Sequence, residues 1–411
     1  MSTAPAPTED ADAPALASAL RDAPFVRLAA RADGDALAAA GVLARALRAT
    51  GVPFQARTAP DPVVDSTDDG LAVTVGTAAA GADLELASRP ASATAFAVAR
   101  ELVGDPVDVA AAGENDTVAD PVIALAGVVA HGDPPGEHPD VLDAAESRDL
   151  VARRPGVAVP TADLADGLAH STLLSAPFSG TPDAAGATLA ELGLPAELDD
   201  EAGRRVASAV ALEAATAAFA TPRAAASVER ALHPYATPEG PFETVGGYAD
   251  VLDAVARERP GTGVALALGH DARTPALETW RDHARVAHGA LADATTGRYD
   301  GLFVARVESD LDADAGDTSA TPVARSALET AARLLRDFRS PESVALVVSE
   351  GSGTTAAHAA VASVDPRNVG EALSSVADVF DGEGYGTARR GAARFGGDTT
   401  EFIAALREAL G

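Results

Sequence analysis

An acidic cluster near the amino terminus has the residue types needed to bind a metal ion or a phosphate. A strand-like apolar run over 24–30 leads into Ala-Arg-Ala-Asp-Gly-Asp, and an Ala-rich helix is expected over 35–49. Carboxylates between a strand and a helix suit hard divalent cations, which take oxygen ligands. Arg31, beside Asp33 and Asp35, carries the opposite charge. Its guanidinium could hold a phosphate through two hydrogen bonds, or form a local ion pair with a neighbouring carboxylate.

A basic cluster lies on a Gly-rich segment near the carboxyl terminus, DGEGYGTARRGAARF over 381–395. Arg389, Arg390 and Arg394 are three positive charges within six residues of a very acidic chain. On a Gly-rich loop, such a cluster could contact phosphate groups. Ion pairing on an acidic surface is the alternative interpretation.

The composition indicates a globular protein adapted to high salt. The chain has 411 residues, 61 of them acidic and 31 basic, for a formal net charge of -30, and every basic residue is Arg. At molar salt the screening length is about 3 Å, which suppresses repulsion among surface carboxylates. We therefore interpret the source as an extreme halophile. There is no Cys, which excludes disulfides, a thiol nucleophile and Cys-ligated zinc.

No run of about 18 strongly apolar residues suggests a membrane span, and the amino terminus lacks the pattern of a signal peptide. We expect a cytoplasmic protein that has no contact with a membrane.

The hydrophobic pattern predicts two α/β lobes joined by a helical connector. Strands alternate with helices over about the first 150 residues, which favours a mainly parallel, helix-flanked sheet. Residues 140–260 are mostly helical in pattern, and 263–269 (GVALALG) is predicted as the strand that opens the second α/β lobe. The closing helix is expected to be capped by Thr399 or Thr400.

The order of these elements resembles the DHH phosphoesterase superfamily, in its RecJ-like branch, over nearly the whole chain. The resemblance implies an α/β fold: a parallel-sheet DHH-like domain, a helical connector and a smaller α/β DHH-associated domain. The expected boundaries are a disordered acidic tail over 1–20, the DHH-like domain with its helical segment over 21–225, and the DHH-associated domain over 226–411.

Most of the family's metal ligands are missing from this sequence. The family's first strand ends in His-x-Asp-x-Asp-Gly, and its carboxylates and imidazoles hold two divalent ions that activate water at a phosphodiester. Here Asp33 matches the last Asp, whereas Arg31 and Ala29 stand at the first Asp and the His. The next core strand ends near Gly76 instead of an Asp, and no Asp-His-His motif follows. Asp133 is a candidate for a fourth Asp.

The DHH-associated domain of the family carries a Gly-Gly-His-Pro-type loop that clamps the substrate. The segment 381–395 resembles this loop through Gly384 and Gly391, but its His is replaced. The resemblance implies a substrate-binding role for these glycines. From their chemistry, Arg31 and the three arginines of the basic cluster are candidates for contacts with phosphate or nucleic acid.

Three hypotheses for the function remain open. The first is a catalytically degenerate RecJ-like scaffold in DNA replication or repair, because Asp33 and Asp133 alone cannot build a two-metal centre. The second is an active, Mn-dependent single-strand exonuclease, and the third a small-molecule phosphoesterase. The first predicts no cofactor, and the enzyme hypotheses require Mn or Mg. The expected partners are weakly bound single-stranded nucleic acid and proteins of replication or repair. Among these proteins, the resemblance implies the GINS complex as the first candidate.

Overall fold

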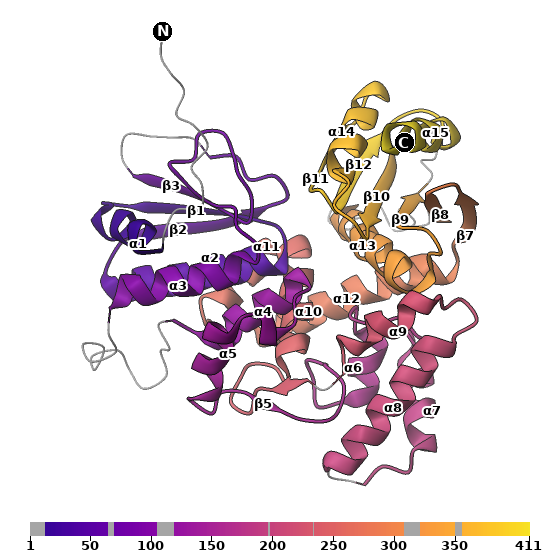
Figure 1. Ribbon diagram of the computed structural model, residues 1–411, viewed down its shortest axis with the longest axis horizontal. Helices are drawn as coiled ribbons and strands as arrows, with labels where there is room; N and C mark the ends of the chain where they lie inside the picture. Colours follow the sequence, from indigo (N-terminus) through magenta and orange to yellow (C-terminus); the bar gives the residue numbers. More distant parts are fainter. Residues whose placement is uncertain are drawn as a thin grey trace. The chain divides into compact units, whose positions relative to one another are not determined.

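A computed structural model describes residues 13–64, 70–104, 119–195, 198–232, 234–307, 321–349 and 356–411. Two compact units are interleaved along the chain (Figure 1). Unit 1 comprises residues 1–152 and 235–279, and unit 2 comprises 153–234 and 280–411. This division differs from the contiguous domains predicted over 21–225 and 226–411, because residues 153–225 belong to unit 2 and residues 235–279 belong to unit 1.

Unit 1 is built around a four-stranded sheet in the order β2-β1-β3-β4, in which every adjacent pair is parallel. Helices α2 and α3 lie side by side along one face of it (Figure 1). The elements are α1 Ala13–Asp22, β1 Val26–Arg31, α2 Gly34–Thr50, β2 Phe54–Ala59, β3 Leu71–Val75, β4 Leu84–Leu86, α3 Ala91–Val103, α4 Pro121–His131, a 3-10 turn Pro135–Glu137, α5 Pro139–Glu146, α10 Val245–Glu258 and α11 Pro260–Ala267. Two short strands, β5 Ala152–Arg153 and β6 Tyr235–Ala236, pair with each other.

Helix α2 is the central element of unit 1. It begins after Asp33 and ends at Gly51, whose φ of 74° is the left-handed conformation that glycine adopts without strain. Most of its side chains are small and buried, because α3, α4, α10 and α11 pack around it. Its amino-terminal end therefore lies at a fixed position beside the carboxyl ends of β1 and β3.

Three local predictions were wrong. Residues 263–269 are not a strand: α11 covers most of them and packs on α2, where Ala267 meets Gly41. An apolar run of this length does not distinguish a strand from a buried helix. The tail predicted over 1–20 lies outside the described residues up to residue 12, and its remainder forms most of α1. The last helix is capped by Asp398, which accepts hydrogen bonds from the amides of the two residues after Thr399.

Unit 2 contains a mixed six-stranded sheet in the order β11-β12-β10-β9-β8-β7, in which only β8 and β9 are parallel. One apolar core lies between this sheet and α6–α9, α12 and α13, and a second lies between its other face and α14 and α15. The elements are α6 Leu164–His170, α7 Pro182–Glu191, α8 Asp200–Thr216, α9 Pro222–Glu229, α12 Arg273–Ala292, β7 Thr295–Tyr299, β8 Leu302–Val307, α13 Thr321–Leu334, a π-helical turn Leu335–Arg339, β9 Val344–Ser349, β10 Ala357–Ser363, α14 Val369–Val379, β11 Glu383–Gly386, β12 Arg390–Phe395 and α15 Thr399–Leu410. The part of α12 up to Thr279 belongs to unit 1.

A buried carboxylate fixes the π-helical turn of unit 2. Asp337 accepts hydrogen bonds from Arg336 at 2.7 Å and from Arg230 at 2.8 Å. Burial by itself raises the pKa of Asp337, but the neighbouring guanidiniums outweigh it and hold this pKa at about 2. Asp337 is therefore ionised and ties the end of α9 to the end of α13.

Among the described residues, no helix combines the length and the apolar character needed to cross a bilayer.

Candidate functional site

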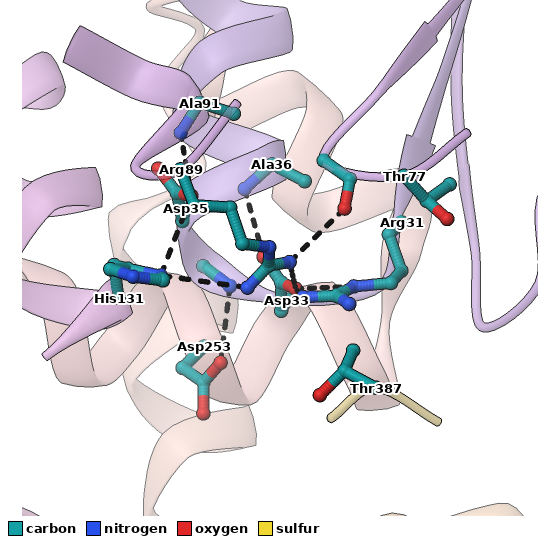
Figure 2. A network of polar contacts seen from close by, with 12 residues as sticks. Arg31, Asp33, Asp35, Ala36, Thr77, Arg89, Ala91, His131, Asp253 and Thr387 are labelled. Atoms are coloured by element: carbon teal, nitrogen blue, oxygen red, sulfur yellow. Dashed lines mark hydrogen bonds and ion pairs between the residues drawn. The ribbon is translucent and has the colours of Figure 1, made fainter. Parts of the chain in front are cut away.

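The candidate site of unit 1 lies where β1 ends and α2 begins (Figure 2). Asp33 occupies the N-cap of α2, and its Oδ1 accepts a hydrogen bond from the amide of Ala36 at 2.9 Å. The side chain of Asp33 is only 3% exposed. One of its two oxygens is thus used to cap a helix, a role that short polar side chains fill wherever a helix starts after a strand.

Two arginines contact the other oxygen of Asp33 (Figure 2). Arg31, at the end of β1, donates from Nε at 2.6 Å and from Nη2 to Oδ2. Arg89, just before α3, donates from Nη2 at 3.4 Å to the same Oδ2 and at 3.1 Å to the carbonyl of Gly76. The local ion pair considered for Arg31 is therefore present, and Arg89 is a second cation that sequence spacing did not indicate.

Asp35 caps a different helix. Its two oxygens accept hydrogen bonds from the amides of Ala91 at 2.8 Å and Ser92 at 2.9 Å, at the start of α3. Burial, with a smaller contribution from the charge of Asp33, raises the pKa of Asp35 to about 6. The Nδ1 of His131 lies 4.0 Å from this carboxylate. Asp35 thus links the beginnings of two helices that are far apart in sequence.

Helix α10 closes the site from a distant part of unit 1. Asp253 accepts a hydrogen bond from the amide of Gly34 at 3.1 Å, and Arg257 is its ion-pair partner one turn further along the helix. A Cβ on Gly34 would lie 2.8 Å from the Cβ of Ala130 and 3.0 Å from the backbone nitrogen of Asp253. Glycine is required here because three helices approach one another at this point.

This arrangement does not fit the divalent ions that the resemblance implies. A Mn or Mg centre needs carboxylate oxygens that point into a shared space. Both oxygens of Asp33 are bonded to an amide and to guanidiniums, and both oxygens of Asp35 to backbone amides. In the described parts of the chain, no group of three or more His, Asp or Glu side chains has the spacing of a metal site.

Asp133, the other remnant candidate, has a separate environment. Its Oδ2 lies 3.2 Å from Nε2 of His138, and both side chains are partly exposed. The two proposed remnant ligands, Asp33 and Asp133, thus belong to two different local networks.

The Gly-rich segment of unit 2 forms the hairpin β11–β12. A Cβ on Gly384 would lie 2.8 Å from the backbone of Ser374 in α14, and one on Gly391 would lie 2.9 Å from the Cα of Gly370. Close packing of α14 on the hairpin thus gives these glycines a structural role, and their proposed role in binding phosphate stays a prediction.

The three arginines of the basic cluster lie along this hairpin. Arg389 is exposed and donates to the carbonyl of Val364. Arg390 is half-buried and Arg394 exposed, and they are two of the alternate residues of β12 whose side chains share one sheet face. Their contact with nucleic acid stays a prediction.

Sequence reasoning missed Arg89 and Asp253 as members of the site, and it considered Asp35 only as a neighbour of Arg31. A weak signal existed for Arg89, which stands directly before the run Pro-Ala-Ser-Ala-Thr over 90–94. No local signal existed for Asp253, which is 219 residues from the glycine it contacts.

Comparison with known proteins gives one close relative. An uncharacterized protein of Haloarcula marismortui, rrnAC1427, is 49% identical over 399 residues, which cover 96% of each chain. Residues 294–408 match the family model of the C-terminal domain of that protein. A homologue from a halophilic archaeon agrees with the adaptation to salt that the composition indicates.

Solved structures with a similar fold include CDC45 from Entamoeba histolytica, with a TM-score of 0.57 at 10% identity, covering 96% of this chain and 97% of that one. A manganese-bound exonuclease RecJ has a TM-score of 0.44 at 14% identity, covering 97% and 92%. The resemblance to the DHH superfamily is confirmed at the level of the fold, as are its parallel amino-terminal sheet and its second α/β unit.

Proposed function

We propose that this chain, which belongs to the same protein family as rrnAC1427 of Haloarcula marismortui, is a catalytically degenerate DHH-fold protein that acts as a nucleic-acid-associated scaffold in DNA replication or repair. Enzymes of the DHH superfamily use two metal ions. Whether this chain is an enzyme of that kind therefore depends on the residues that stand at the metal-ligand positions.

The hydrogen bonds that the Asp33 carboxylate already accepts support this proposal most directly. A metal ion bound to Oδ2 would compete with Arg31 and Arg89, and one bound to Oδ1 would compete with the capping amide. Losing the cap alone costs about 1 kcal/mol, and a displaced guanidinium would lose hydrogen bonds to a charged group worth about 1.5–3 kcal/mol. Asp33 is therefore used to hold α2 and two arginines together.

A scaffold needs a partner, and GINS is the one we propose. CDC45 has a similar fold, and its name is not that of an exonuclease. A protein with this fold therefore need not be an exonuclease. At molar salt, attraction between exposed charges is weak. The interface should therefore be mainly apolar and bury at least about 1,000 Å².

The catalytic part of the proposal is tested with the purified protein in molar KCl and added Mn²⁺. We expect no cleavage of single-stranded DNA or RNA and no stoichiometric Mn²⁺ binding by electron paramagnetic resonance. Asp33→Asn and Asp133→Asn are the matched variants. Cleavage that either substitution abolishes would overturn the proposal and favour the metal-dependent exonuclease.

The partner is tested separately, by mixing the protein with the GINS complex of its own source and applying the mixture to gel filtration in molar KCl. We expect one co-eluting species. An unrelated acidic halophilic protein of similar size is the control. Separate elution of GINS would remove GINS as the partner and leave the catalytic conclusion unchanged.

A further inference from the structure

We propose that Arg31 and Arg89 form a phosphate-binding site in unit 1, at the position where the resemblance places divalent ions. The inference rests on the proposed function in one respect, which is that no metal ion competes for Asp33. The ligand is an oxyanion, and the guanidiniums of Arg31 and Arg89 bind it.

The topology of the sheet places these arginines where parallel α/β folds bind ligands. The chain passes from β1 to β2 on one side, and β3 lies on the other side of β1. This reversal creates a switch point at the carboxyl ends of β1 and β3, and ligands of open α/β sheets bind in such positions. Arg31 ends β1, and Arg89 donates to the carbonyl of Gly76, the residue after β3.

The exposure of the side chains places positive groups toward solvent. The side chain of Asp33 is 3% exposed, whereas those of Arg31 and Arg89 are 12% and 26% exposed. That of His131, whose Nδ1 lies 3.5 Å from Nη1 of Arg89, is 24% exposed. The carboxylate of Asp33 is therefore more deeply buried than the two arginines and the histidine beside it.

The charge of the site favours an anion. Two guanidiniums contribute +2, and the amino-terminal ends of α2 and α3 about +0.5 each. Asp33 and Asp35 contribute -2, and the pair of Asp253 with Arg257 cancels. The sum is about +1, in a chain whose formal net charge is -30.

Arg89 has the geometry of a group that can turn toward a ligand. Its contacts with Asp33, Gly76 and His131 measure 3.4, 3.1 and 3.5 Å, which are long for charge-assisted hydrogen bonds. The planar fork of a guanidinium matches two phosphate oxygens. A phosphate could thus bind Arg89 without breaking the short contacts between Arg31 and Asp33.

The test is isothermal titration calorimetry in molar KCl with inorganic phosphate as the probe. We expect saturable binding of one phosphate. Arg89→Gln should weaken it roughly 10- to 100-fold, as expected for the loss of a charged hydrogen-bond donor. Arg89→Lys, which keeps the charge but loses the fork, should lie between. Arg100→Gln, which removes an exposed arginine from α3, should change the affinity less than twofold.

The same titration with a short single-stranded oligonucleotide, with and without a terminal phosphate, identifies the source of the phosphate. If the terminal phosphate raises the affinity and Arg89→Gln abolishes this gain, the ligand is the end of a nucleic acid. If Arg89→Gln weakens the binding of inorganic phosphate but not of the oligonucleotides, the ligand is a free phosphate. Equal binding by wild type, Arg89→Gln and Arg100→Gln, or no saturable binding by wild type, would overturn the site. Asp33-dependent Mn²⁺ binding would instead overturn the proposed function.

Discussion

Replacing Asp33 by Ala should destabilise the protein, because this carboxylate stabilises the fold at three contacts. The variant loses the cap of α2, worth about 1 kcal/mol. It also leaves Arg31 without its hydrogen bonds to a charged partner, worth about 1.5–3 kcal/mol. Relief of the repulsion between Asp33 and Asp35 offsets part of this loss. We expect a net decrease of about 2–3 kcal/mol in the free energy of unfolding.

The assay is urea unfolding in molar KCl, followed by far-ultraviolet circular dichroism. Asp133→Ala is the matched control, because its pairing with His138 is partly exposed and should be worth less than about 1 kcal/mol. A carboxylate kept for catalysis gives the opposite result, since removing it commonly stabilises the fold. An Asp33→Ala variant as stable as wild type, or no less stable than Asp133→Ala, would refute the structural role.

Three further predictions concern unit 2. The pKa of Asp337, about 2, lies below its ordinary value of 3.8, so its contribution to stability is complete above about pH 4 and is lost as the pH falls through about 2. The difference in unfolding free energy between wild type and Asp337→Asn should be about 2 kcal/mol at neutral pH and shrink below pH 4; a difference that stays the same at pH 3 would contradict this. Gly370→Ala should destabilise the protein, because the new Cβ would lie 2.5 Å from the backbone of β11. In Gly289→Ala, in α12, the new Cβ would meet nothing within 4 Å, and the substitution should stabilise the protein by up to about 1 kcal/mol. Thermal melts that rank the two variants alike would refute the packing argument. Replacing Arg389 and Arg390 by Ala should flatten the log–log salt dependence of single-strand binding by roughly 1–1.5, and an unchanged slope would show that these arginines do not contact phosphates.

Much of the local structure of the site was predictable from neighbouring residues. The strand, the acidic turn and the small-residue helix occur where the pattern places them, and Asp33 stands at the expected junction. The wrong prediction of a strand over 263–269 has a physical cause. An apolar run such as 263–269 suits a strand or a buried helix equally, and only its packing on α2 decides the outcome.

The sequence by itself determined the acidic, lysine-free composition that indicates adaptation to salt, the α/β pattern that resembles the DHH superfamily, and the presence of Arg31 and Ala29 where that resemblance implies metal ligands. These features depend on composition and on residues within a few positions of each other. Only the tertiary structure decided what the remaining groups do. Arg89 and the start of α3 reach the acidic cluster from 56 residues away, and Asp253 reaches Gly34 from 219 residues away. Such contacts depend on how helices pack around α2, and residue spacing along the chain does not encode that packing.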